Sequence, residues 1–170
     1  MRARVSSFLI ALAMIAASAF GGEAAGPTVI PRVDEFIDAP RTLFGKHLDE
    51  IEQRLGKPLG VRARSATTAA TTNTGASLEL AYPGVVIEVA PSRALQRVVI
   101  TEGRYRLPLG LNLGVSRNQV EEILGEPQDA TDLRSMYLYS DGFPDTVEFA
   151  FRDGNVHRIE WSYSTGDQPR

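Results

Sequence analysis

The clearest pattern of apolar and polar positions in the chain is a short amphipathic helix with both of its ends marked. Ser116 and Gln119 have the spacing of a capping box at its start, and Gly125 stands where a helix stops. Its apolar face is formed by Val120, Ile123 and Leu124. The pattern predicts a helix over residues 117–124.

An earlier stretch of the chain repeats this pattern. The positions of Gly114, Glu121, Leu124, Gly125 and Pro127 are matched, at the same spacing, by Gly45, Glu52, Leu55, Gly56 and Pro58. The start is weaker, because His47 takes the place of Ser116, and we interpret His47 as a capping or surface residue. Convergence would also explain the match, since Leu-Gly-x-Pro is a common helix ending, but the segments after both helices favour duplication.

Three segments with strand patterns follow each of the two helices. After the first helix they cover residues 78–82, 85–89 and 96–101. After the second they cover residues 135–139, 146–151 and 156–163, with a tight turn at Asp153-Gly154 between the last two. We therefore expect an α+β protein made of two tandem units, each a helix followed by a three-stranded antiparallel sheet, with the helices packed on one face of the sheet.

The N-terminus has the pattern of a secretory signal peptide over residues 1–19. Arg2 and Arg4 precede an uncharged apolar stretch, and Ala17-Ser18-Ala19 supplies the small residues of a cleavage site. The apolar stretch has about a dozen residues, fewer than the ~20 that a membrane-spanning helix needs. We therefore expect cleavage after Ala19 and a periplasmic or secreted protein.

The rest of the chain divides into a linker, two units and a tail. Val33, Phe36 and Ile37 have helical spacing, which predicts a short helix over Arg32–Asp38, ending before Pro40. The expected parts are a linker at 20–40 that contains this helix, a first unit at 41–104 with a Thr/Ala-rich loop at 65–76, a second unit at 105–165, and a tail at 166–170.

Composition narrows the classes of partner. The chain has no cysteine, which removes disulfides, thiolate chemistry and a lipid anchor on cysteine. Its formal net charge is −3, and the short basic doublets at 62–64 and 104–106 fall short of a nucleic-acid-binding face. We expect no cofactor, and as partner another protein of the cell envelope, with no nucleic acid, no membrane span and no lipid anchor.

The run from Leu109 to Pro127 combines a glycine, a capped helix and a Leu-Gly-x-Pro ending, and Tyr137-Leu138-Tyr139 and a hairpin follow it. In these features, residues 109–163, and more weakly 44–101, resemble the SmpA/OmlA family, which contains the small lipoprotein of the outer-membrane β-barrel assembly machine. A tandem pair of such units also resembles the β-lactamase inhibitory protein, which presents a concave sheet to its target. Both resemblances imply protein binding.

One departure from the SmpA/OmlA pattern changes what the resemblance implies. Members that belong to the assembly machine are anchored through an N-terminal lipidated cysteine, which this chain lacks. A freely diffusing periplasmic relative is therefore the better expectation than a direct part of that machine.

Candidate catalytic and metal-binding residues are few. His47 and His157 are the two histidines, far apart in the sequence, and we interpret His157 as an edge residue of a strand. Asp141 and Asp145 lie in one loop, which supplies too few oxygen ligands for calcium and has the composition of a turn. We expect no catalytic and no metal-binding residues. An envelope hydrolase that uses carboxylates remains a third hypothesis.

Aromatic side chains on a sheet face without helices would supply large, rigid contact area for a partner. The candidates are Tyr82, Tyr137, Tyr139, Phe143, Trp161 and Tyr163. Core packing is the alternative, and it is favoured for Trp161 and Tyr163, which share a face with Ile159. For the strand around Tyr137 we expect Met136 and Leu138 inside.

The charged residues of the last two strands are expected on the exposed face of the sheet. These residues are Glu148, Arg158 and Glu160. The sequence favours a soluble periplasmic protein–protein interaction module, an accessory factor of envelope or outer-membrane protein assembly. The alternative is a secreted inhibitor of an enzyme such as a β-lactamase or protease.

Overall fold

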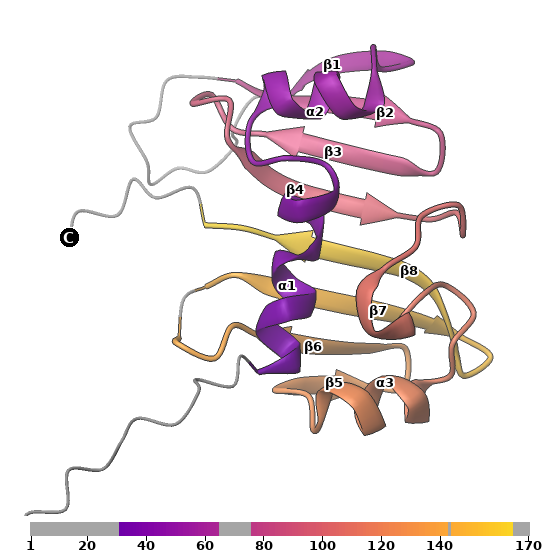
Figure 1. Ribbon diagram of the computed structural model, residues 1–170. Helices are drawn as coiled ribbons and strands as arrows, with labels where there is room; N and C mark the ends of the chain where they lie inside the picture. The colour runs from indigo at the N-terminus through magenta and orange to yellow at the C-terminus, as the bar shows by residue number, and fades with distance from the viewer. Residues whose placement is uncertain (1–30, 65–75, 143, 165–170) are drawn as a thin grey trace, which may run out of the picture.

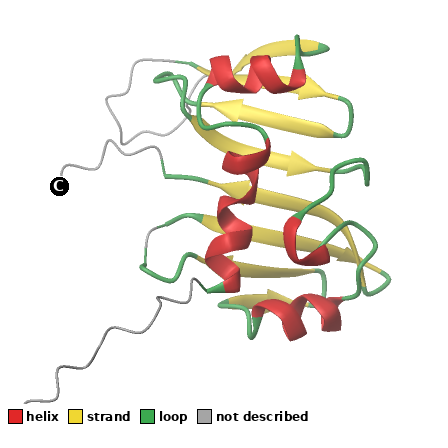
Figure 2. Ribbon diagram, viewed as in Figure 1, coloured by secondary structure: helices red, strands yellow, loops and turns green. Residues whose placement is uncertain are grey.

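The computed structural model describes residues 31–64, 76–142 and 144–164, and within them it contains three α-helices, one 3₁₀ turn and one sheet (Figures 1 and 2). The helical elements are α1 (Arg32–Leu43), α2 (Leu48–Leu55), η1 (Pro108–Gly110) and α3 (Arg117–Leu124). The strands are β1 (Gly60–Arg64), β2 (Ser77–Tyr82), β3 (Val85–Val89), β4 (Leu95–Ile100), β5 (Asp129–Thr131), β6 (Arg134–Leu138), β7 (Thr146–Arg152) and β8 (Asn155–Ser162).

The eight strands form one antiparallel sheet in the order β1-β2-β3-β4-β8-β7-β6-β5. The first half of the chain supplies β1 to β4 and the second half supplies β5 to β8. The halves join where Arg97–Ile100 of β4 pairs with Ile159–Ser162 of β8. The expected pair of tandem helix-plus-three-strand units is therefore wrong, although the α+β class holds.

The strands that the sequence pattern missed are β1 and β5, the two edges of the sheet. Every residue of β1 is exposed, and β5 has only three residues. An alternating apolar pattern arises only where one face of a strand is buried, so an exposed edge strand lacks that signal. Main-chain pairing to β2 and β6 holds these strands in place.

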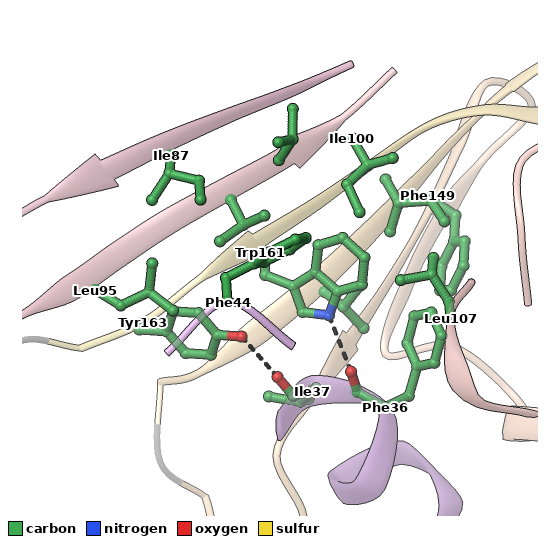
Figure 3. Close-up of a cluster of buried hydrophobic side chains, with 14 of the residues drawn as sticks. Phe36, Ile37, Phe44, Ile87, Leu95, Ile100, Leu107, Phe149, Trp161 and Tyr163 are labelled. Carbon is green, nitrogen blue, oxygen red and sulfur yellow. Dashed lines mark hydrogen bonds between the residues drawn. The ribbon is translucent and has the colours of Figure 1, made fainter. Parts of the chain in front are cut away.

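All three helices lie on the same face of the sheet (Figure 2). The side chains beneath them form the core, and the strands accordingly alternate between buried and partly exposed positions, most regularly in β3 and β7. Phe36 of α1 stacks on Phe149 of β7, with ring centroids 5.4 Å apart, and lies 5.5 Å from the ring of Trp161 on β8 (Figure 3). No helix formed by the described residues lies on the opposite face of the sheet.

Helix α1 is longer than expected, because it continues through Pro40 to Leu43. A proline inside a helix has no N–H to give to the carbonyl oxygen four residues earlier, here that of Phe36. The indole Nε1–H of Trp161 donates to this oxygen at 3.0 Å, and the hydroxyl of Tyr163 donates to the Ile37 oxygen at 2.8 Å (Figure 3). Residues 32–43 therefore belong to the folded core and are not a linker.

Several expectations concern residues outside the described ranges. The signal peptide at 1–19, the linker residues before 31, most of the loop at 65–76, Phe143 and the tail at 166–170 fall there. In the part of the chain that is described, no helix is both long enough and apolar enough to span a membrane.

Candidate functional site

Four of the six aromatic candidates lie in the core beneath the helices, and none of these four offers an exposed surface. Tyr82, Tyr137, Trp161 and Tyr163 are all buried. The hydroxyl of Tyr82 donates to the carbonyl oxygen of Gly56 at 3.2 Å, and the hydroxyl of Tyr137 donates to that of Gly125 at 3.1 Å. These tyrosines complete the C-terminal ends of α2 and α3, where carbonyl groups lack partners within the helix.

The expectation for the strand around Tyr137 is wrong. Tyr137 is fully buried, whereas Met136 and Leu138 are partly exposed on the opposite face. Tyr139 lies half-buried on the helix side, where its hydroxyl donates to Asp38 Oδ2 at 3.3 Å. Both faces of the strand around Tyr137 carry large side chains with apolar surface, Met136 and Leu138 on one and Tyr137 and Tyr139 on the other. Hydrophobicity alone therefore does not determine which of the two faces is buried.

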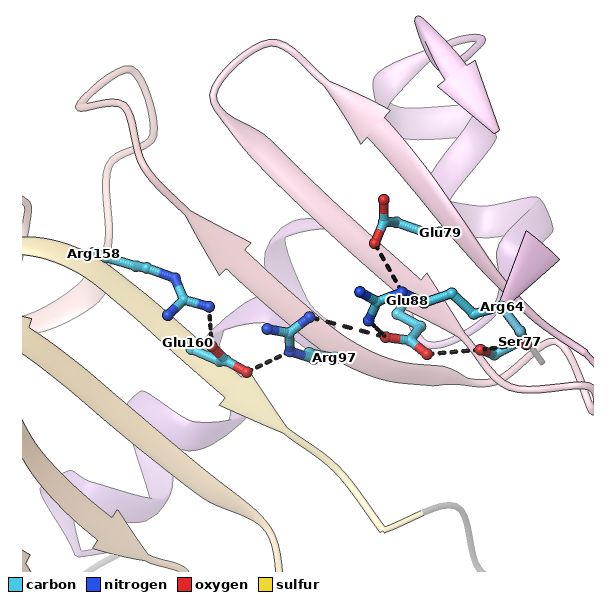
Figure 4. A network of polar contacts seen from close by, with 7 residues as sticks. All are labelled: Arg64, Ser77, Glu79, Glu88, Arg97, Arg158 and Glu160. Carbon is cyan, nitrogen blue, oxygen red and sulfur yellow. Dashed lines mark hydrogen bonds and ion pairs between the residues drawn. The ribbon is translucent and has the colours of Figure 1, made fainter. Parts of the chain in front are cut away.

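The face without helices instead carries a series of charged side chains that runs from the edge strand β1 to the central strand β8 (Figure 4). We call this series the charged belt. Its members are Arg64 (β1), Glu79 (β2), Glu88 (β3), Arg97 (β4), and Arg158 and Glu160 (β8). Each of these side chains forms an ion pair with at least one other member.

Two arginines bridge the carboxylates of the belt. Arg64 reaches Glu79 at 3.3 Å and Glu88 at 3.6 Å. Arg97 lies between Glu88, at 4.0 Å, and Glu160, to which its Nε–H donates a hydrogen bond. The hydrogen bond with Glu160 raises the pKa of Arg97, so its charge is fixed at physiological pH. Arg158 also donates to Glu160, and Ser77 donates to Glu88 at 2.6 Å.

Strand register places like charges directly opposite one another on this face. Glu79 faces Glu88 across β2 and β3, and Glu148 faces Glu160 across β7 and β8. Opposed like charges destabilise a sheet, by roughly 0.2–1 kcal/mol per pair. Further along, Arg134 of β6 pairs with both Glu148, at 3.3 Å, and Asp129, at 2.9 Å. The expected placement of Glu148, Arg158 and Glu160 on the helix-free face is confirmed.

An apolar pair lies beside the belt. Val86 of β3 and Val99 of β4 are opposite each other, and Val99 in turn is opposite Glu160. Val86 is partly exposed and Val99 is 7% exposed. The face therefore combines charges that pair with one another and a small, largely buried apolar pair.

The loop between β6 and β7 is fixed to α1 on the helix side of the sheet. Asp145 accepts hydrogen bonds from Arg41 Nη2 and from the amide of Ser164, both at 2.8 Å, and Asp34 accepts from the amide of Ser140 at 2.9 Å. Both carboxylates are buried. Asp145 is therefore a structural partner of α1, a role that its place in a turn sequence did not indicate.

The histidines lie on separate elements. His47 is exposed at the N-cap of α2, where its side chain makes no capping hydrogen bond, and His157 is half-buried on β8. Among the described residues, no group of three or more His, Asp or Glu is arranged to hold a metal ion. A cavity of about 530 Å³ lies near α1 and the start of α2, lined by Asp38, Arg41, Thr42, Lys46, His47, Ala94, Leu95 and Ser164.

The sequence reasoning missed the belt members of the first half. Glu79, Glu88 and Arg97 occupy the polar positions of strands that were correctly located. The hairpin register between these strands would have placed Glu88 opposite Arg97. The contact between Arg97 and Glu160 joins residues 63 positions apart, and no local signal indicates it.

Comparisons with known proteins show the fold alone. No family model matches the chain, and no curated protein matches it, so the resemblance to the SmpA/OmlA family gains no support. Among solved structures, the chain is similar to part of an extracellular protein containing an SCP domain from Bacillus anthracis, with 10% identity and a TM-score of 0.50. That similarity covers 89% of this chain, and the chain spans half the length of that protein.

A second solved structure is a presumed beta-lactamase inhibitor protein from Streptococcus mutans. The identity is 17%, over 69% of this chain and 82% of that protein, with a TM-score of 0.28. A score at that level carries no argument about a shared fold or function.

Proposed function

We propose that this protein is an exported, non-catalytic binding module that contacts another envelope or secreted protein through the helix-free face of its sheet. The observation that carries the proposal is the charged belt together with the opposed glutamates of the same face, Glu79 with Glu88 and Glu148 with Glu160. A sequence selected for stability alone would place opposite charges at directly facing positions. Here two pairs of facing positions hold glutamates on both strands.

The belt suits recognition of a protein surface. Its central carboxylates are largely shielded, with side-chain exposures of 14% for Glu88 and 19% for Glu79 and Glu160. Arginines hold each of them, two for Glu88 and Glu160 and one for Glu79, so little side-chain freedom is lost on binding. Fixed charges contribute mainly to choice of partner and to association rate, while Val86 and Val99 add an apolar centre.

The test uses Glu148→Gln, which removes one carboxylate from an opposed pair and the ion pair of Glu148 with Arg134, and leaves both arginine contacts of Glu160 in place. Glu122→Gln on the exposed surface of α3 is the matched control. Immobilised wild-type chain and both variants are incubated with an envelope extract of the source organism. The retained protein is then purified, and its affinity for each variant is measured by calorimetry.

We expect the wild type and Glu122→Gln to bind alike and Glu148→Gln to bind at least about fivefold more weakly. Its free energy of unfolding should stay within about 0.5 kcal/mol of the wild type, because the loss of the exposed ion pair with Arg134 and the removal of the like-charge contact with Glu160 offset each other. Equal affinities for all three chains would contradict the proposal. If the retained protein is an enzyme whose rate falls at equimolar amounts of this chain, the binding module acts as an inhibitor; unchanged activity favours an accessory factor.

A further inference from the structure

Strand β1 is an edge of the sheet, and among the described residues it pairs with β2 alone, which leaves one of its main-chain sides without a partner there. Its five residues are all exposed, whereas the opposite edge, β5, has only three residues. Exposed edges of this kind are templates for pairing with another strand, and native proteins usually protect them with charges, proline or a covering element. Within β1 there is no proline, and the charged residues are two arginines, Arg62 and Arg64.

Two exposed apolar side chains accompany this edge. Leu59, next to the strand, is 77% exposed, and Val61 is 56% exposed. Val61 is opposite Leu80, a buried core residue, so it lies on the helix side of the sheet. Large apolar side chains left in water beside unpaired backbone groups are what an added strand would cover.

The other side of β1 is basic. Arg62 and Arg64 alternate with the apolar positions, and Arg62 is opposite Glu79 on the helix-free face. Arg64 is held by Glu79 and Glu88, whereas Arg62 forms no ion pair with any residue in the described ranges. A strand added beside β1 would place its own side chains directly across from these arginines.

A second copy of the chain fits this edge poorly. Antiparallel pairing of residues 60–64 with the same residues of another copy sets Arg62 against its own counterpart, and like charges in that position are destabilising. A strand that alternates acidic and apolar residues avoids this repulsion. It places carboxylates across from Arg62 and Arg64 and apolar side chains beside Val61.

We propose that β1 is a docking strand for an extended segment of another protein in which acidic and apolar residues alternate. The segment forms main-chain hydrogen bonds with the free side of β1 and extends the sheet by one strand. This docking strand shares Arg64 with the charged belt, but it binds through the main-chain edge of the sheet and not through its helix-free face, so it goes beyond the proposed function.

The probe is a short synthetic peptide of alternating valine and glutamate, acetylated and amidated at its ends. Hydrogen exchange of the free protein is measured first by NMR, then with millimolar peptide. In the free protein the alternate β1 amides that point away from β2 should exchange rapidly, and the peptide should protect them. The amides of β5 should not change.

Charge-swap variants test the recognition. Arg62→Glu should weaken binding of the glutamate peptide by about fivefold or more, since one attraction becomes a repulsion. The same variant should bind a peptide in which lysine replaces glutamate better than the wild type does. Arg152→Glu, at an exposed arginine near the end of β7, is the matched control and should bind like the wild type. Glu148→Gln, on β7 and far from β1 in the strand order, should also leave peptide binding unchanged, so the two proposals can fail independently.

Three results would overturn the proposal. The first is slow exchange of the outward β1 amides in the free chain, which would show that the edge is already covered. The second is self-association through β1 in sedimentation experiments. The third is the absence of peptide protection at β1, or equal protection at both edges of the sheet.

Discussion

Helices α2 and α3 occupy corresponding places in the two halves of the sheet, and they end alike but begin differently. Each ends at a glycine whose carbonyl oxygen accepts a hydrogen bond from a tyrosine hydroxyl, that of Tyr82 in the first half and that of Tyr137 in the second. At its start α3 has a complete capping box between Ser116 and Gln119.

The start of α2 has no side-chain cap. The turn between β3 and β4 substitutes for it, because the amide of Leu48 donates to the carbonyl oxygen of Arg93 at 3.0 Å and the amide of Leu95 donates to that of Lys46 at 2.8 Å. The same structural need is therefore met by local sequence in α3 and by a tertiary contact in α2. A further helix packs on the second half of the sheet, because Phe36 of α1 contacts Phe149 and Trp161.

The largest expected effect on stability concerns the packing of α1 on the second half of the sheet. Trp161→Phe removes the donor to the Phe36 oxygen, which Pro40 cannot satisfy, and leaves space in the core. We expect a loss of about 3 kcal/mol in the free energy of unfolding, measured by urea titration. Tyr163→Phe keeps its ring and loses only a hydroxyl, so it should lose about 1 kcal/mol. A smaller loss for Trp161→Phe than for Tyr163→Phe would contradict the role of Trp161 at α1.

The tyrosines at the helix ends should make the protein sensitive to alkali. Burial raises the pKa of Tyr137 to about 12, and it raises that of Tyr82 as well. A phenol with a raised folded-state pKa contributes stability that is complete below about pH 10 and is lost as the pH rises to about 12, because the unfolded state ionises first. At about pH 11, Tyr137 alone should lower the free energy of unfolding by roughly 1 kcal/mol.

Unfolding measured across this pH range in Tyr→Phe variants compares the two helix ends. Tyr137→Phe should flatten the alkaline loss of stability more than Tyr82→Phe, since Tyr137 is completely buried and Tyr82 is 6% exposed. Identical pH profiles for Tyr137→Phe and the wild type would rule out a raised pKa at Tyr137.

The helix starts should respond unequally to alanine. Ser116→Ala removes the capping box of α3 and should cost about 1 kcal/mol in the free energy of unfolding. His47→Ala at the corresponding position of α2 should change it by less than about 0.5 kcal/mol, because the His47 side chain makes no capping bond. Equal losses from the two substitutions would show that the starts do not differ as described.

The smallest expected effect is a gain. His47→Ser places a serine three residues before Glu50, which is the spacing of a capping box. We expect the free energy of unfolding to rise by about 0.5 kcal/mol, with His47→Ala as the control. A loss of stability for His47→Ser would indicate that the turn between β3 and β4 already leaves no room for a side-chain cap.

The parts of the fold that could be predicted are those whose signals lie close together in the sequence. The start, face and stop of α3 all fall between Ser116 and Gly125, and its predicted bounds are confirmed. Strand β1 was not predicted, because Val61 and Arg62 are both exposed and no burial pattern distinguishes the two faces of the strand. The path of α1 through Pro40 depends on Trp161, which is 125 residues away from Phe36.

The candidate site was harder to predict than the fold. The aromatic residues were selected for a free face, but the helices cover the face on which Tyr137 and Trp161 lie. The helix-free face is instead occupied by charged residues at the polar positions of several strands. Which of these charges meet depends on strand register and on the pairing of β4 with β8, and neither is encoded within a single segment.

The most direct test of the central claim is to determine which face of the sheet contacts the partner. A photo-crosslinking residue is placed at Ser162, at the end of the central strand β8 on the helix-free face, or at Glu122 on α3 as the control. With the purified partner, the chain modified at position 162 should form a defined adduct, and the chain modified at position 122 should form none. An adduct from position 122 alone would contradict the assignment of the helix-free face as the binding surface.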